Sequence, residues 1–339
     1  MCLRLIALLL FLSLAACQSG SSERTISGFA QGTTYHVTWV DGKSVASVET
    51  IQQKVDQLLA ELDTQLSNYR DDSEISRLNR QETGDWLPVS SEIIGLLTVA
   101  QTIYQRSESC YDLTVKPLFD LWGFSKHENR IPSDQEIAAL QAHIGMNLLE
   151  IDASQQRIRK KDPSLKIDLS SIAQGYSVGR VAKALESLGI HDYLVEIGGE
   201  MLTKGRKSSG KAWRIGVESP SATSRDLQKI LTMHDATETA VMTAGTYRNF
   251  FEQQGKQYSH ILNPKSGKPV DHHLYSVTIV HDDPTWADAW DTALLCMGED
   301  RAKGLADREN LKVLLIYEQN GKLQEYSSKA FEDWQAKPE

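Results

Sequence analysis

The sequence is poor in cysteine. Four of its 339 residues are cysteines, and two of these, Cys2 and Cys17, belong to an apolar N-terminal segment. The other two, Cys110 and Cys296, are too few and too far apart for the disulfide framework of a small secreted domain, and we expect no thiolate metal site. They can pair with each other, but we favour two separate buried thiols.

The sequence also lacks an excess of positive charge. Its 36 lysines and arginines are outnumbered by 45 aspartates and glutamates, which gives a net charge of −9. Such a surface repels a phosphate backbone, so we expect no nucleic-acid partner. No low-complexity stretch or clear repeat occurs, and no glycine-rich dinucleotide fingerprint follows a predicted strand.

Long apolar runs are absent after the first few residues. Residues 3–16 read LRLIALLLFLSLAA, which is too short for a mature membrane-spanning helix and is typical of a signal peptide. The following Cys17 completes a lipobox, in which the cysteine thiol is acylated before cleavage, although a chance cysteine is the alternative. We therefore expect a signal at 1–16, a lipidated Cys17 with a serine-rich tether over 17–25, and one folded domain over 26–335.

Helical and strand patterns alternate without a regular βαβ rhythm, which predicts an α+β fold. Apolar residues recur on one helical face between Val48 and Leu66, and Ser133 with Glu136 forms a capping box. We expect helices over 48–66, 90–105, 133–145, 171–188 and 286–297, and strands over 35–40, 193–197, 213–217, 276–280 and 312–317.

The clearest candidate for chemistry is the predicted helix that carries Asp288, Asp291 and Thr292. Their spacing of i, i+3 and i+4 places three oxygen-bearing side chains on one helical face. Oxygen ligands favour Mg²⁺ or Ca²⁺ over softer metals, and Mg²⁺ leaves positions open for substrate phosphates. The alternative is an ordinary solvated acidic face.

Three further segments supply phosphate-binding and proton-transfer candidates. The first, 166–176, enters a helix N-terminus, where amide groups attract anions, although Asp168 and Ser171 can equally be helix caps. The second ends a strand in small residues before Arg248, which can contact a phosphate or a neighbouring loop. The third holds His260 in a Pro/Gly turn, either as a general base or as a structural histidine.

Together these segments resemble the ApbE flavin transferases, which are FAD:protein FMN transferases. The resemblance runs in order along nearly the whole mature chain, through Gly32-Thr33, Tyr69, 73–79, 111–118, 121–124, 168–176, 195–200, 243–248, 259–267 and 287–292. It implies an ApbE-like α+β fold with mixed sheets, packed helices and an active site in a cleft between two closely associated subdomains. It also implies Mg²⁺ ligands at Ser171, Asp288, Asp291 and Thr292, and FAD contacts at Gln31, Tyr69, Cys110, Tyr111, Asp112, Asp168, Gln174 and Leu262.

Three of these FAD positions depart from the family pattern. Gln31 stands where methionine is common, Cys110 where a small residue is usual, and Gln174 where lysine or glutamate is usual. The departures put individual flavin contacts in doubt, but they leave the expected metal side chains in place.

The resemblance implies transfer of FMN from FAD to a serine or threonine hydroxyl, with release of AMP. His260 or a metal-site carboxylate such as Asp288 would take the hydroxyl proton. Expected acceptors carry an Asp-x-x-Ser/Thr-Gly-Ala-Thr type motif and are subunits of membrane redox complexes, reached by a lipoprotein that faces the periplasm from the inner membrane. A Mg²⁺-dependent FAD pyrophosphatase and a non-catalytic flavin-binding lipoprotein are the alternatives.

Overall fold

A computed structural model describes residues 22–42, 46–125, 128–220, 226–234 and 237–336. The expected signal peptide and Cys17 lie outside these residues. Within them, no helix combines the length and the apolar content that crossing a membrane requires. The expected tether over 17–25 is too long, because strand β1 already begins at Ser22, which pairs with Asp41 of β2. The polar composition of this segment hid a strand that pairs with β2 in a hairpin.

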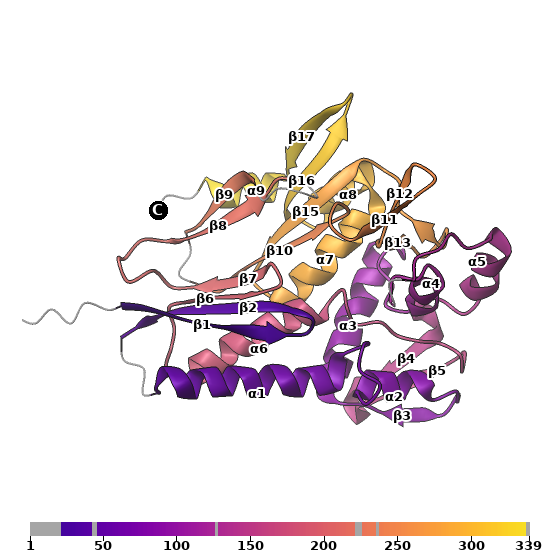
Figure 1. Ribbon diagram of the computed structural model, residues 1–339, viewed down its shortest axis with the longest axis horizontal. Helices are drawn as coiled ribbons and strands as arrows, with labels where there is room; N and C mark the ends of the chain where they lie inside the picture. Colours follow the sequence, from indigo (N-terminus) through magenta and orange to yellow (C-terminus); the bar gives the residue numbers. More distant parts are fainter. Residues whose placement is uncertain (1–21, 43–45, 126–127, 221–225, 235–236, 337–339) are drawn as a thin grey trace, which may run out of the picture.

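The centre of the molecule is an antiparallel sheet in the order β1-β2-β6-β7-β10-β15-β16-β17. Figure 1 shows β1 and β2 beside the long helix α1 and the β16–β17 hairpin at the opposite edge. The strands are β1 (Ser22–Ala30), β2 (Thr33–Asp41), β6 (Tyr193–Ile197), β7 (Glu200–Lys204), β10 (Thr239–Gly245), β15 (Leu274–His281), β16 (Lys312–Gln319) and β17 (Lys322–Ser327).

Helices cover one face of this sheet and enclose the main core. Helix α1 follows the predicted bounds, is capped by Ser47, and buries Ile51, Val55 and Leu59. Helices α6 and α7 pack on β6, β7, β10 and β15, and α3 packs on α7. The helices are α1 (Val48–Leu66), α2 (Glu74–Arg80), α3 (Ser91–Arg106), α4 (Lys116–Leu121), α5 (Asp134–Gln141), α6 (Ala173–Ser187), α7 (Pro284–Met297), α8 (Glu299–Arg308) and α9 (Lys329–Gln335).

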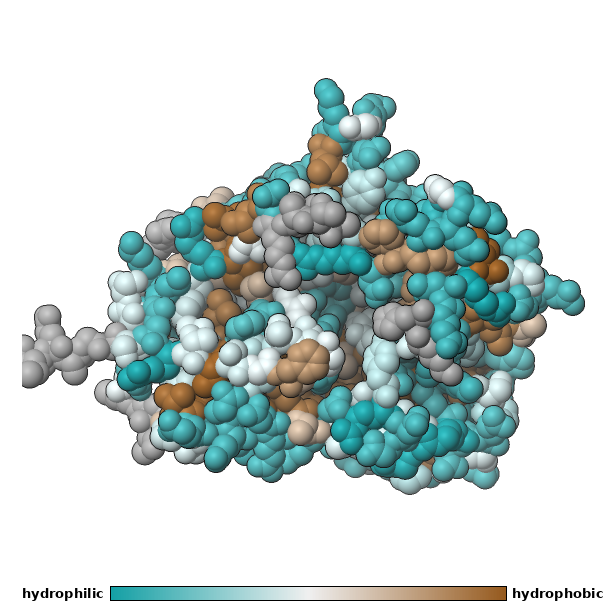
Figure 2. All heavy atoms as spheres, viewed as in Figure 1, coloured by the Kyte–Doolittle hydropathy of each residue, from teal (hydrophilic) through white to brown (hydrophobic). Residues whose placement is uncertain are grey.

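The other face of the sheet has a smaller core. The hairpin of β8 (Trp213–Glu218) and β9 (Leu227–Met233) covers it together with α9, so that Trp213, Phe331 and Trp334 pack on Val241 and Leu314. Hydrophilic side chains dominate the face of the molecule in Figure 2, and apolar ones gather there only in small patches.

Short elements complete the fold beside the helical layer. Helices α4 and α5 share an apolar cluster of Leu118, Trp122, Phe124, Ile137 and Leu262. The remaining strands are β3 (Trp86–Pro88), β4 (Leu149–Asp152), β5 (Arg157–Lys160), β11 (Phe250–Gln253), β12 (Lys256–Ser259), β13 (Leu262–Asn263) and β14 (Lys268–Pro269). The predicted α+β class is therefore confirmed.

Three predicted helix boundaries were wrong by two residues or more, one of them the start of α7, which lies at Pro284 and not at residue 286. The capping box at Ser133 and Glu136 forms as expected, but α5 ends at Gln141, before the turn that leads to Gly145. Helix α6 begins at Ala173, with Ile172 at its N-cap and no side-chain cap. Ser171 therefore does not cap α6, which leaves its hydroxyl free for another contact.

Candidate active site

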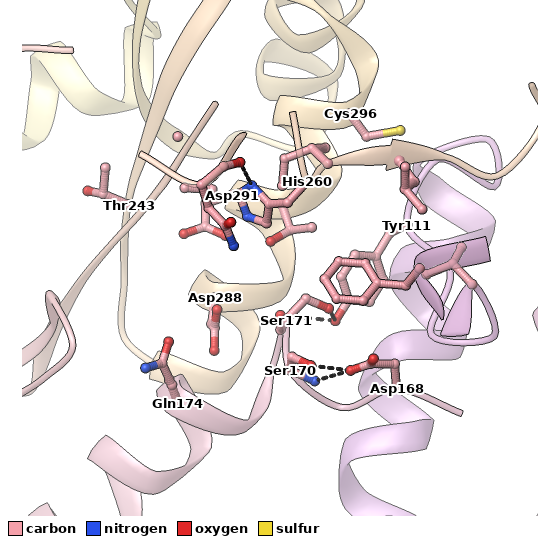
Figure 3. Close-up of a pocket in the computed structure, with 18 of the residues that line it drawn as sticks. Tyr111, Asp168, Ser170, Ser171, Gln174, Thr243, His260, Asp288, Asp291 and Cys296 are labelled. Carbon is pink, nitrogen blue, oxygen red and sulfur yellow. Dashed lines mark hydrogen bonds between the residues drawn. The ribbon is translucent and has the colours of Figure 1, made fainter. Parts of the chain in front are cut away.

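A cleft of about 640 Å³ lies between the start of α6, the buried helix α7, the end of β10 and the α4 region. Its size suits a cofactor-sized ligand. Figure 3 shows side chains from these elements converging on it. The expected site residues that line it are Tyr69, Cys110, Tyr111, Asp112, Asp168, Ser171, Gln174, Arg248, His260, Leu262, Asp288, Asp291 and Thr292.

Three buried carboxylates form the most unusual feature of the cleft. Asp288 and Asp291 come from α7, and Glu200 begins β7. One carboxylate oxygen from each lies within 4.8 Å of the other two. Three negative charges so close together in a poorly hydrated site repel one another strongly unless a cation or protons neutralise them.

Burial raises the pKa of all three carboxylates, and mutual repulsion adds to the rise for Asp291 and Glu200. Burial raises the pKa of Asp288 to about 7. The pKa of Asp291 lies well above its ordinary value because of burial first and the charges of Glu200 and Asp288 second. Burial followed by the charge of Asp288 raises the pKa of Glu200 in the same way. The cluster therefore favours either bound protons or a bound cation.

The hydrogen bonds of the cluster show which of its atoms remain open. Both carboxylate oxygens of Asp291 are buried and accept no hydrogen bond of good geometry within the described part of the chain, and the adjacent Thr292 amide and hydroxyl offset only part of the rise in its pKa. Asp288 accepts one from the Gly175 amide of α6 at 2.7 Å, and Glu200 accepts one from the Thr243 amide at 3.3 Å. An oxygen-only set with unused acceptors fits a hard divalent cation such as Mg²⁺.

Helices α6 and α7 approach closely at this point because Gly175 has no side chain. A Cβ there would lie 2.4 Å from the Pro284 carbonyl oxygen and 2.6 Å from Cβ of Asp288. The segment before α6 therefore reaches the carboxylate cluster, as the expected site requires. Glycine at this position is a packing requirement of the site.

Ser171 lies in the turn that precedes α6. Its hydroxyl donates to the Tyr111 hydroxyl at 3.2 Å, and the Tyr111 hydroxyl lies 3.3 Å from the Ser171 carbonyl oxygen. Asp168 accepts hydrogen bonds from the amide and the hydroxyl of Ser170 in the same turn. Ser171 is thus held in the cleft, and its role as a metal ligand stays a prediction.

His260 is arranged to accept a proton. Its Nδ1 lies 2.8 Å from the Asn249 carbonyl oxygen, drawn as a dashed line in Figure 3. Because a carbonyl oxygen only accepts, Nδ1 carries the hydrogen and Nε2 keeps its lone pair. Burial also lowers the pKa of His260, which favours the neutral imidazole.

The two cysteines are joined by a disulfide, so the expectation of two separate thiols was wrong. Cys110 and Cys296 lie 186 residues apart in the sequence, but their Cα atoms are 5.8 Å apart. The packing of α3 against α7 brings them together, a contact that no local pattern reveals. Both cysteines line the cleft.

Two expected ligand residues have other arrangements. Gln31 lies outside the first cleft, in an adjoining hollow of about 690 Å³, where its amide donates to Ser177. Tyr69, Ser170 and Gln174 line both hollows, so Gln31 is near the expected FAD site without being in the same cleft. Its place at the β1–β2 turn explains the separation. Arg248 lines the first cleft and also forms an ion pair with Glu218, the last residue of β8, so its expected contact with a phosphate stays a prediction.

Glu200 is the residue of the cluster that we had not predicted as a ligand. Its signal was present, because it ends the segment Val195–Glu200 that resembles the family. Two glycines with positive φ precede it and turn the chain from β6 into β7. Only the sheet shows that this turn brings Glu200 next to α7.

Comparisons with known proteins agree with this arrangement. The family model described as "ApbE family" matches residues 31–315. The FAD:protein FMN transferase of Vibrio cholerae is 37% identical over 98% of this chain and 99% of its own, and that of Escherichia coli is 32% identical over 91% and 88%.

Solved structures show the same fold. The flavin transferase ApbE from Vibrio cholerae is 36% identical with a TM-score of 0.84, covering 92% of this chain and 99% of its own. The apo flavinyl transferase ApbE of Pseudomonas stutzeri is 35% identical with a TM-score of 0.85, covering 94% and 98%. The matches span most of each relative, and the residues matched by the family model, 31–315, include every residue that lines the cleft. The chain therefore belongs to the ApbE family.

Proposed function

We propose that this protein is a Mg²⁺-dependent FAD:protein FMN transferase. The observation that carries the proposal is the cluster of Glu200, Asp288 and Asp291, buried in a cleft of cofactor size and open at both Asp291 oxygens. Similarity to proteins named FAD:protein FMN transferases identifies FAD as the substrate.

Glu200, Asp288 and Asp291, with Ser171 and Thr292 beside them, would hold the cation. A bound Mg²⁺ would neutralise the pyrophosphate and make AMP a better leaving group. Nε2 of His260 takes the proton of an acceptor serine or threonine hydroxyl. The hydroxyl oxygen then bonds to the flavin-side phosphorus as the bond from that phosphorus to the bridging oxygen breaks, and AMP leaves with that oxygen.

The flavin side of the substrate would contact the other wall of the cleft. Tyr69, Tyr111 and Leu262 offer apolar and aromatic surface, while Asp112, Asp168 and Gln174 offer polar contacts. Burial raises the pKa of Asp112 to about 6, and its carboxylate is held by the amide and hydroxyl of Thr114. It is therefore a positioned acceptor for a flavin polar group.

The location and the acceptor are also part of the proposal. The lipobox at Cys17 supports a lipoprotein held on the inner membrane and facing the periplasm. There it would modify membrane redox-complex subunits that carry the Asp-x-x-Ser/Thr-Gly-Ala-Thr type motif. Mass spectrometry of the exported protein should show a chain that begins at an acylated Cys17, and Cys17→Ser should yield an unlipidated chain that keeps residues 1–16. An unmodified Cys17 in the exported protein would contradict the anchor.

Incubation with FAD, Mg²⁺ and a protein bearing the acceptor motif tests the function. We expect a fluorescent acceptor that is heavier by one FMN, and AMP in equal amount. The matched control is the same acceptor with its serine or threonine changed to alanine, which should stay unlabelled. Free FMN and AMP without labelling would instead indicate a pyrophosphatase, and unchanged FAD a flavin-binding protein.

A further inference from the structure

The disulfide connects the two walls of the cleft. Cys110 belongs to the segment 107–115 between α3 and α4, which supplies Tyr111 and Asp112 to the expected FAD site. Cys296 lies on α7 one turn after Thr292 and two turns after Asp288, on the same helical face. One covalent bond therefore joins the flavin-lining segment to the helix that carries the carboxylates.

The segment at Cys110 has an unfavourable backbone. Glu108 and Ser109, directly before the cysteine, have φ values of 55° and 65°. This left-handed region disfavours residues that carry a Cβ. Hydrogen bonds from the Ser109 amide to the Tyr104 carbonyl and from the Tyr111 amide to the Ser107 hydroxyl help to hold it. A local conformation of this kind persists only where its surroundings enforce it.

We propose that the Cys110–Cys296 disulfide is a positioning element of the FAD site, which fixes segment 107–115 against α7 before the dinucleotide binds. The inference rests on the proposed FAD-dependent function. Because segment 107–115 is already fixed, FAD binding does not have to order it and loses less conformational entropy. Loss of the bond should therefore weaken FAD binding and leave the chemistry at the carboxylates largely unchanged.

Reduction of the native protein is the first test. A dithiol reductant converts the bond into two thiols and is itself oxidised to a cyclic disulfide. We expect the KM for FAD to rise about tenfold while kcat stays within about twofold. Hydrogen exchange of residues 107–115 should become faster. Trapping of free thiols with iodoacetamide, followed by mass spectrometry, reports the fraction reduced.

Cysteine variants form the second test. Cys296→Ala, Cys110→Ala and the double variant should raise the KM for FAD by a similar factor, because each removes the same bond. Leu295→Val is the matched control: it removes one buried carbon from α7 next to Cys296, and it should leave the KM for FAD unchanged. If the variants do not fold, the reduced native protein still decides the question.

Three outcomes would overturn the inference. Free thiols in protein exported and purified without reductant would show that the bond does not form. A lower Tm with an unchanged KM for FAD and unchanged hydrogen exchange would show that the bond only stabilises the fold. A fall in kcat with an unchanged KM for FAD would show that the bond acts on the chemical step and not on FAD binding. Absence of FAD turnover in the oxidised protein would instead contradict the proposed function, while hydrogen exchange would still report on the segment.

Discussion

Glu200→Gln tests the metal site without changing the size of the side chain. Each oxygen pair in the cluster lies within 4.8 Å, and at an effective dielectric constant of about 20 two charges at that separation repel by about 3.5 kcal/mol. Glutamine is neutral at every pH, so the variant neither repels the two aspartates nor has to take up a proton at this position, as Glu200 must without metal. Without metal, the variant should therefore be at least as stable as the native protein.

The affinity of the Glu200→Gln variant for a divalent cation, in contrast, should fall. The variant loses one of three carboxylates that attract the cation, and even residues outside the ligand shell cost about 10- to 100-fold in metal affinity when altered. We expect the Kd for Mn²⁺ to rise by at least that factor, as measured by the EPR signal of the free ion. The rise in Tm on adding Mg²⁺ should shrink in parallel.

Glu150→Gln is the matched control on the separate strand β4. Glu150 is half-buried, forms ion pairs with Arg159 and Lys161, and does not line the cleft. Its neutralisation should leave the Kd for Mn²⁺ unchanged. A Glu200→Gln protein that binds Mn²⁺ normally, or that loses stability without metal, would show that Glu200 has a structural role only.

Three further predictions concern the same cleft. Asp288→Ala should abolish Mg²⁺-dependent FAD turnover in a protein that circular dichroism still shows to be folded, and full activity would refute the metal assignment. Because burial lowers the pKa of His260, the rate should rise with pH as the imidazole loses its proton. His260→Gln should lower kcat by about 10²- to 10⁴-fold and remove that rise, as measured in a pH–rate profile. Burial raises the pKa of Asp288 from 3.8 to about 7, so between these values the folded, metal-free protein holds a proton that the unfolded chain has released. Its Tm should therefore fall as pH rises through this window, and Mg²⁺ should reverse the fall. A Tm that is flat across the window in EDTA would contradict the burial of this charge.

The sequence predicted the parts of the site that depend on local spacing. Asp288, Asp291 and Thr292 share a helical face whatever the rest of the chain does, and α7 places them as expected. The bounds of α1 followed in the same way from its apolar repeat, and the structure adds Ser47 as its N-cap. The sequence pattern of a single helix is sufficient to predict which of its side chains share a face.

Contacts between distant elements could not be predicted in this way. Glu200 joins the cluster because β7 and α7 meet across the core, 88 residues apart at Asp288. The disulfide depends on α3 packing against α7. No pattern within a single helix or strand contains either of these contacts. The start of β1 at Ser22 is a shorter-range feature, because it is fixed by the hairpin with β2 that turns at residues 31–32.

The charge of the cleft also decides the form in which substrate arrives. With Glu200, Asp288 and Asp291 ionised, the cleft repels the pyrophosphate of free FAD, and the Gly175 amide offsets only part of that charge because it already donates to Asp288. A divalent cation reverses the sign of the interaction, since it attracts both the carboxylates and the phosphates. On the proposed function, FAD and the cation would therefore bind cooperatively, each raising the affinity of the site for the other by the same factor. The Kd for FAD should then fall when Mg²⁺ is added, and a Kd for FAD that is the same with and without Mg²⁺ would contradict this coupling.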